Sequence, residues 1–212
     1  MKELTVEQTK EMMRHVADKM IESKAMLCEI DGNIGDGDHG LGIERGFASV
    51  KQFLQDKNPE TIYDVFTGTG MAMMNSMGGA SGVIFSAIFM GIAQQPKEDT
   101  LSLDVFVGMC ESGLKKIKVV GKADKGDKTM IDALEPAVEA MKKAPKDCEF
   151  PELLQIAYEA ALQGVEDTKK YPAKFGRAKF LGERALGHED AGAVSVSIIF
   201  KSASGFPPSS NF

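Results

Sequence analysis

The chain of 212 residues lacks tryptophan, has only three cysteines and contains no long apolar run. Cys28, Cys110 and Cys148 are odd in number and far apart, which excludes a disulfide framework or a cysteine zinc site and fits a reducing cytoplasm. The longest apolar run, 82–93, is shorter than the ~20 residues that a membrane-spanning helix needs. The N-terminus also lacks the layout of a secretory signal. We therefore expect a cytoplasmic protein with no membrane partner.

Basic residues are in deficit, since 25 Lys and Arg stand against 31 Asp and Glu, for a formal net charge of −6. This balance gives no electrostatic reason to expect nucleic acid as a partner. The length suits one sizeable hydrophobic core. Because no repeat, linker or shift in composition divides the chain, we expect residues 1–212 to form a single domain.

Apolar residues recur at helical spacing along most of the chain, as in Ile43, Phe47, Val50 and Leu54. Thr5 and Gln8 have the spacing of a capping box. The patterns predict a helix from Thr5 to about Cys28, a loop over 31–42, and helices that begin near Thr61, Gly82, Ser102, Met130 and Leu153. Residues 169–190 are expected to be mainly loop, and 202–212 to be loosely ordered. Residues 194–198 alternate like a strand, but a lone strand has no partner, so we expect a helix there. The prediction is an all-α fold of about eight helices.

The most informative stretch places Asp31, Asp36 and Asp38 within eight residues, among glycines at 32, 35, 37, 40 and 42. Clustered carboxylates repel one another unless a cation neutralises them. Oxygen ligands suit a hard ion such as magnesium or calcium. A long surface turn is the simpler interpretation, because Asp and Gly are turn formers. The number of carboxylates favours a metal site.

Three familiar motifs fail on spacing or context. An EF-hand that began at Asp31 would need a bidentate Glu at its twelfth position, where Gly42 stands. Residues 35–40 match G-x-G-x-x-G, yet no strand precedes them. Residues 121–129 resemble a Walker A loop with one extra residue, which moves Lys128 out of register.

Other polar residues allow two interpretations each. The glycine cluster 78–82 fits either phosphate binding at a helix start or close helix packing. Lys128 is the basic candidate in its loop, although a solvated lysine is commoner. Arg177 fits a phosphate ligand or a helix cap, His39 fits a phosphate contact or a solvent-facing side chain, and His188 is expected to be structural. Since Ser81 lacks a neighbouring base, we find no local nucleophile and no catalytic residue beyond the metal ligands.

Four motifs occur in a characteristic order, at 34–40, 78–82, 126–130 and 176–193. Together they resemble the nucleotide-binding L subunits of dihydroxyacetone kinase, and the likeness spans about residues 5–200. The resemblance implies a barrel of eight antiparallel amphipathic helices with the nucleotide and metals at one end. It also implies a phosphotransferase subunit that acts on an alcohol group, of the bacterial type that depends on the phosphotransferase system.

The resemblance assigns site residues. Asp31, Asp36 and Asp38 would hold two Mg²⁺ ions. The nucleotide, ADP or ATP, would contact His39, Gly40, Leu41, Gly42, Ala80, Ser81, Gly121, Met130, Arg177, Asp190, Ala191 and Gly192. Family members usually have Asn, Gln and Pro where this chain has Gly42, Glu189 and Ala191. The replacement at Glu189 is expected to add charge near the nucleotide, and that at Ala191 to loosen a closing loop.

The resemblance further implies partners. A ketose-binding kinase subunit would hold dihydroxyacetone or a related short ketose, and a phosphohistidine-carrying subunit would donate phosphate. We also expect a homodimer. The main alternative is a non-enzymatic calcium-binding helical module, and a second is a complete ATP-dependent kinase.

Overall fold

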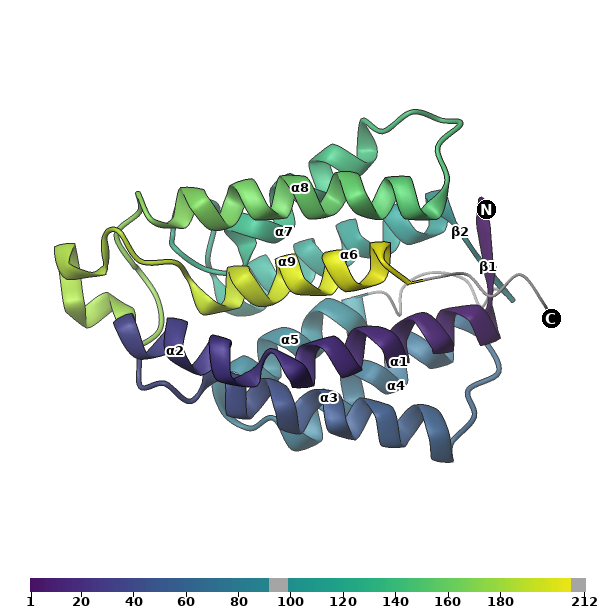
Figure 1. The fold of residues 1–212 in the computed structure, drawn as a ribbon, viewed down its shortest axis with the longest axis horizontal. Coiled ribbons are helices and arrows are strands. Elements are labelled where there is room, and N and C mark those ends of the chain that lie inside the picture. Colours follow the sequence, from purple (N-terminus) through teal and green to yellow (C-terminus); the bar gives the residue numbers. More distant parts are fainter. Residues whose placement is uncertain (92–98, 207–212) are drawn as a thin grey trace.

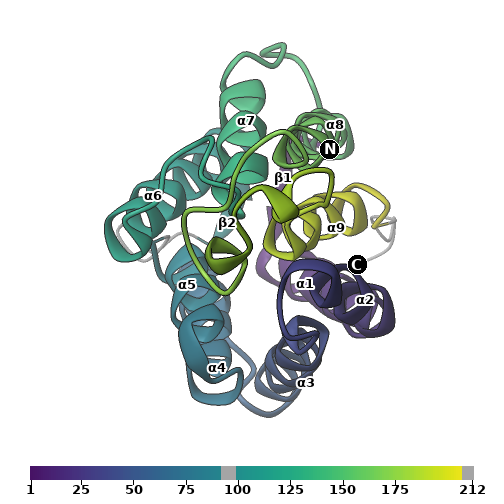
Figure 2. The ribbon, with the colours of Figure 1, turned by 90° about the vertical axis from the view of Figure 1, so that its left-hand side faces the viewer.

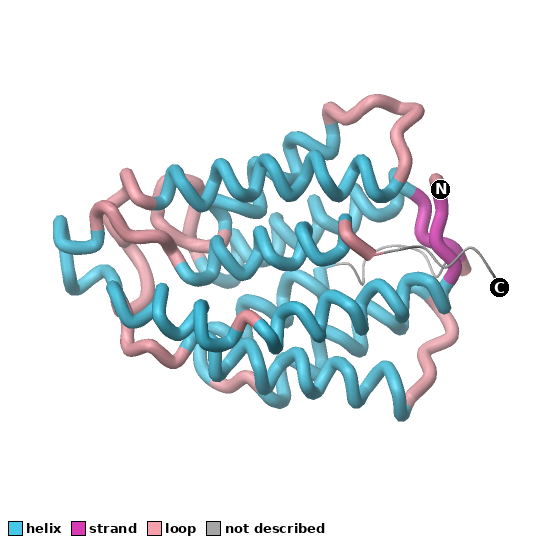
Figure 3. The backbone as a smooth tube through the Cα atoms, viewed as in Figure 1, coloured by secondary structure: helices cyan, strands magenta, loops and turns pink. Residues whose placement is uncertain are grey.

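Helices make up most of the chain in the computed structural model, which describes residues 1–91 and 99–206 (Figure 3). The α-helices are α1 Val6–Glu22, α2 Lys24–Ile34, α3 His39–Asp56, α4 Ile62–Ser76, α5 Gly79–Gly91, α6 Leu103–Gly121, α7 Ile131–Lys142, α8 Phe150–Thr168 and α9 Ala191–Ser204. A 3₁₀ helix, η2, covers Ala178–Ala185, and two strands, β1 Glu3–Thr5 and β2 Thr100–Ser102, pair antiparallel. The end of the helix expected to begin near Gly82, which the sequence places before Pro96, and the tail 207–212 lie outside the described residues.

Eight of these helices form a closed ring. Helix α1 packs against α3, each helix from α3 to α8 packs against the next, and α9 packs against both α8 and α1. Successive helices run in opposite directions (Figure 1), and the view along the barrel shows the ring (Figure 2). Helix α2 continues from α1 at one end and contacts α3 and α9. The predicted antiparallel helical barrel is therefore confirmed.

Apolar side chains from every helix of the ring fill the barrel. The largest fully buried ones include Phe47, Phe85, Leu54 and Ile117. The flexible methionine side chain serves as core filler, at Met12, Met13, Met20, Met73, Met77, Met109, Met130 and Met141. All three cysteines are free. Within the parts of the chain that the structure describes, no helix combines the length and apolar character needed to cross a membrane.

Local signals in the sequence set several helix starts. The amide of Gln8 donates to Thr5 Oγ1 (3.2 Å) and the amide of Thr5 to Gln8 Oε1 (2.9 Å), which confirms the capping box. Ser102 Oγ caps α6 as expected. The alternating segment 194–198 lies in α9, as predicted. The alternating pattern does not separate a buried face from an exposed one, because Ser195 and Ser197 are also buried. Their hydroxyls donate to backbone carbonyls of the same helix.

Four expectations about the elements were wrong. The first helix does not run unbroken to Cys28, because the hydroxyl of Ser23 bonds back to the carbonyl of Lys19 and α2 starts there. The loop expected over 31–42 shrinks to residues 35–38, since α2 extends to the buried Ile34. The tail expected to be loosely ordered from residue 202 is helical up to Ser204, where α9 ends, whereas 169–190 is mainly loop as predicted, with η2 inside it. The paired strands were also missed, because three residues are too few to show alternation.

Candidate functional site

A cavity of about 890 Å³ opens at the end of the barrel where α3, α5, α7 and α9 begin. The N-terminus lies at the opposite end (Figure 1). Each of these four helices contributes residues to the cavity wall, including His39, Ala80, Ile131 and Gly192. A helix N-terminus carries unpaired N–H groups and the positive end of the helix dipole. Four such ends around one cavity favour an anionic ligand.

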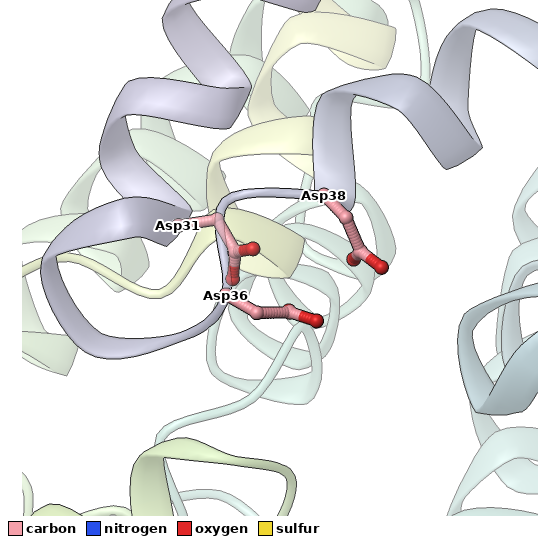
Figure 4. Close-up of side chains that lie close together, drawn as sticks. All are labelled: Asp31, Asp36 and Asp38. Atoms are coloured by element: carbon pink, nitrogen blue, oxygen red, sulfur yellow. The ribbon is translucent and has the colours of Figure 1, made fainter.

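Three carboxylates stand at one side of this cavity. Asp31 lies in the last turn of α2, Asp36 in the short link and Asp38 directly before α3. One oxygen from each carboxylate lies within 4.8 Å of the others, and the side chains face the same space (Figure 4). Such an all-oxygen set fits a hard divalent cation. The three predicted metal ligands therefore do come together.

Glycines make the acidic link possible. Gly37 has a φ of +73°, which L side chains rarely adopt. A Cβ added at Gly35 would lie 2.4 Å from Asp31 Oδ1. The amide of His39 approaches Asp31 Oδ2 at 3.3 Å, so this carboxylate also accepts from the first turn of α3. Gly35 and Gly37 therefore let the link turn tightly enough for the three carboxylates to face one point.

A second glycine turn precedes α5. Gly78 and Gly79 have φ values of +72° and +60°, and a Cβ on either would meet no atom within 4 Å. The positive φ angles favour glycine, and the open space leaves the backbone accessible from the cavity. Ala80 and Ser81 follow in the first turn of α5 and line the cavity. Close packing accounts for Gly82, where a Cβ would lie 3.1 Å from Met77 Cβ.

One wall of the cavity is apolar, and of its residues only Met130 was assigned to the nucleotide from the sequence. Its side chains come from the start of α5, the end of α6 and the start of α7. They are Val83, Ile84, Ile117, Val120, Ala123, Met130 and Ile131. In the sequence these residues continue the core periodicity of their helices. Only the position of each at a helix end that faces the cavity distinguishes them from core residues. Such a wall suits a flat apolar group beside the anion site.

Residues 169–190, which we call the strap, cross the end of the barrel in the end-on view (Figure 2). Phe175, Gly176, Arg177 and Ala178 of the strap line the cavity. The guanidinium of Arg177 pairs with Asp36 Oδ2 at 2.8 Å, although its side chain is 71% exposed. The strap therefore brings a cation to the acidic cluster.

His39 and Asp190 are held by the chain itself. His39 Nε2 lies 2.8 Å from Ser195 Oγ, which in turn bonds to the carbonyl of Ala191. Burial lowers the pKa of this histidine, which favours the neutral ring. Asp190 Oδ2 accepts from the amide of Ala193 at 2.8 Å and caps α9. Burial raises the pKa of Asp190 to about 7.

Most of the residues assigned to the nucleotide from the sequence line this cavity. They are His39, Gly42, Ala80, Ser81, Gly121, Met130, Arg177, Asp190, Ala191 and Gly192. Gly40 and Leu41 do not line it. Gly40 faces α2, where a Cβ would lie 2.1 Å from the carbonyl oxygen of Lys24.

Two charged residues lie elsewhere than expected. Lys128 is neither solvated nor directed at the cavity, because its ammonium group donates to backbone carbonyls and its exposed fraction is 2%. Glu189 does not line the cavity and pairs with Lys169 at 3.0 Å. Ala191 is the first residue of α9, so the family position for Pro is a helix start and not a free loop.

Comparison with known proteins matches residues 33–205 to the DAK2 domain family. The ADP-binding subunit DhaL of the PEP-dependent dihydroxyacetone kinase 1 of Listeria innocua is 37% identical over 183 residues, 86% of this chain and 87% of that subunit. The ADP-binding subunit DhaL of the PTS-dependent kinase of Lactococcus lactis is 33% identical over 198 residues, 93% and 96% of the two chains.

Among solved structures, the dihydroxyacetone kinase of Citrobacter freundii in complex with AMP-PNP and Mg²⁺ is similar with a TM-score of 0.70 and 28% identity. The likeness covers 92% of this chain and 33% of that one, so this chain spans about a third of that kinase. The family match covers most of the chain, and the fold and the acidic cavity end agree with it. The chain belongs to the DAK2 domain family.

Proposed function

We propose that this chain is the ADP/ATP-binding subunit of a kinase for dihydroxyacetone or a related short ketose. One observation carries the proposal: three carboxylates with oxygens within 4.8 Å face a cavity at which four helices begin. The carboxylates suit Mg²⁺, and the helix ends suit the phosphates that such ions accompany. The names of the two bacterial relatives, both ADP-binding subunits, support the same function.

Phosphoryl transfer needs a positioned donor and neutralised phosphate charge rather than a covalent protein intermediate. We propose two Mg²⁺ ions, held by Asp31, Asp36 and Asp38, which would supply that neutralisation when bound. The first turns of α3, α5 and α9 would donate N–H groups to phosphate oxygens. Arg177, released from Asp36, would offer its planar guanidinium to the same oxygens. The apolar wall around Ile84 and Ile117 would hold the base and exclude water.

Among the described residues that line the cavity, the one imidazole, His39, is engaged with Ser195, so we propose that a ketose-binding partner subunit completes the active site. Exposed apolar side chains at this end support docking there. Phe180 of η2 is 78% exposed, and Val83, Val119 and Leu186 are also exposed. We further propose that a phosphohistidine-carrying subunit donates the phosphate and that the chain forms a homodimer. Residues 1–212 would form a single domain, and the protein would be cytoplasmic. A calcium module would need no such cavity beside its carboxylates.

Nucleotide content tests the metal assignment. Asp36→Asn should lose most of the Mg²⁺-dependent ADP binding, because two cations would be left with too few anionic ligands. Asp104→Asn, an exposed carboxylate at the start of α6 and the far end of the barrel, should bind as the parent does. Calorimetric titration with ADP and Mg²⁺ measures both. Full binding by Asp36→Asn would refute the site.

Turnover tests the division of labour between subunits. The chain alone, with ATP and Mg²⁺, should not phosphorylate dihydroxyacetone, and activity should appear when a ketose-binding subunit is added. Phe180→Ser should raise the partner concentration needed for half-maximal activity about tenfold or more, as expected for an exposed aromatic anchor. Leu162→Ser on α8, with 42% exposure, is the matched control and should have no effect. Robust turnover by the chain alone would make it a complete kinase.

A further inference from the structure

Lys128 is the one lysine of the 126–130 motif, and nothing in the proposed chemistry uses it. Its exposed fraction is 2%, and its backbone has a φ of +59°, a conformation that costs energy outside glycine. Its Nζ donates to the carbonyl oxygen of Thr168 at 2.6 Å and to that of His188 at 2.5 Å. The two hydrogen bonds therefore offset the cost of a strained backbone and of a buried ammonium group at Lys128.

The two carbonyls mark the two ends of the strap. Thr168 is the last residue of α8, and His188 precedes Asp190, the cap of α9. One ammonium group therefore bridges the points where the strap leaves the barrel and returns to it. Thr168 Oγ1 also accepts from the amide of Asp190 at 3.1 Å, which joins the same two points.

Besides the bonds of Lys128, the strap is held by two backbone hydrogen bonds, from the amide of Lys174 to the carbonyl of Asp127 (3.2 Å) and from the amide of Gly187 to the carbonyl of Lys169 (2.8 Å). Its buried contacts are few. Among residues 169–190, only Ala185 is buried. Gly176, Gly182 and Gly187 have positive φ values, so the backbone turns sharply three times. A segment with few buried contacts opens at low free energy.

The other side-chain contacts of the strap are ion pairs with at least one partner in contact with water, although Asp127, the partner of Lys174, is itself only 11% exposed. Lys174, with 62% side-chain exposure, pairs with Asp127 at 2.6 Å, and Arg177 pairs with Asp36. Lys169 pairs with Glu189 at 3.0 Å, where the two side chains are 34% and 28% exposed. Ion pairs in contact with water contribute little. Hydrogen bonds from a buried charge are stronger. Their loss would take the ammonium donor from the carbonyl of His188, while the carbonyl of Thr168 would keep the amide of Tyr171 at 3.2 Å. Among the side-chain contacts that hold the strap, those of Lys128 are thus the most buried.

The strap forms part of the wall of the cavity, through Phe175 to Ala178, and leads directly into Asp190 to Gly192. A ligand that fills the cavity is enclosed by the strap on this side. We infer that Lys128 is a positioning residue, which fixes the strap over the bound nucleotide and so sets the rate of nucleotide release. The inference rests on the proposed function for the identity of the ligand, but not for the restraint itself.

Amide hydrogen exchange of the ligand-free protein tests the restraint. Lys128→Met keeps the chain length and apolar stem but removes the ammonium group. Exchange over 169–190 should become at least about tenfold faster, while the helices of the ring keep the protection of the parent. The matched control is Lys174→Met, which removes an exposed lysine of the strap and should change exchange less than about twofold. Unchanged exchange over the strap in Lys128→Met would overturn the inference.

Nucleotide release is measured by displacing a fluorescent ADP analogue with excess ADP in Mg²⁺. Release should be about tenfold faster or more from Lys128→Met, and that from Lys174→Met within about twofold of the parent. Equal rates for both variants and the parent would refute the role in release. If Lys128→Met does not fold, Lys128→Gln, whose amide can still donate to one carbonyl, serves in both assays with a smaller expected effect. Failure of the parent to bind the analogue would refute the proposed function, while the exchange experiment still decides the restraint.

Discussion

Gly40 and Gly42 lie two residues apart in the first turn of α3, yet they face different surroundings. A Cβ at Gly40 would lie 2.1 Å from the carbonyl oxygen of Lys24 and 2.8 Å from Cys28 Sγ, whereas one at Gly42 would meet no atom within 4 Å. Gly40→Ala should therefore lower the free energy of unfolding by about 1–3 kcal/mol through overpacking. Gly42→Ala should raise it by about 0.5–1 kcal/mol. Urea denaturation of both variants checks this, and equal effects would contradict the different surroundings.

Asp190 gives the fold a pH dependence. Its pKa is about 7 in the folded state against an ordinary value of 3.8, so the folded state holds a proton that the unfolded state has released between these values. The free energy of unfolding should then fall as pH rises from about 4 to 7. Asp190→Asn keeps a capping side chain but does not titrate. Its stability relative to the parent should increase from pH 5 to pH 7.5 in urea denaturation. Parallel curves would exclude a raised pKa at this residue.

Individual side chains were predictable from sequence where one short segment contains all of them. Asp31, Asp36 and Asp38 meet because only a few residues separate them. The environment of Lys128 was not predictable, since its acceptors, Thr168 and His188, come from a segment that sequence patterns describe only as polar loop. The surroundings of a position at a helix start, which differ between Gly40 and Gly42, likewise depend on which neighbour the helix packs against.

Helix α9 begins at Ala191, and this start can be tested as an element. Proline is favoured at the first position of a helix, and Asp190 has the extended conformation (ψ 123°) that a following proline requires. Ala191→Pro should therefore raise the free energy of unfolding by about 0.4–1 kcal/mol. Ala193→Pro is the control and should destabilise, because it removes the amide that donates to Asp190. Thermal denaturation compares them. A loss of stability in Ala191→Pro would show that the pyrrolidine ring of the proline does not fit at this point of the cavity wall.

Elements followed from the sequence where a local signal and the packing agree. The Thr5 capping box and the apolar stripe of α3 are both visible in the sequence and both present in the fold. The acidic segment misled because glycine and aspartate favour turns, whereas burial of Leu27 and Ile34 on one face extends α2 to the edge of the link. At the end of α2, burial of apolar side chains outweighs the low helix propensity of glycine and aspartate.

For the whole molecule, ADP and Mg²⁺ together should stabilise far more than either alone. Ligand that binds only the folded state at about one hundred times its Kd adds about 2.7 kcal/mol to the free energy of unfolding. Each component alone lacks the charge partner that the acidic cavity end or the phosphates require. Thermal denaturation with ADP, Mg²⁺, both, and both with a chelator measures this. A full shift with calcium alone would favour the non-enzymatic module.

The closed ring places the first and the last described helix next to each other, since α1 packs against α9. All other neighbours in the ring follow one another closely along the chain, so this seam is the contact with the greatest separation in sequence. Contacts of that kind have the largest loop-closure cost and should form late in folding. The site spans the seam: α2 and the link to α3 supply the carboxylates on one side, and α9 supplies Asp190 to Gly192 on the other. During synthesis, the three carboxylates therefore emerge early, but the cavity is complete only after α9 has left the ribosome and joined α1.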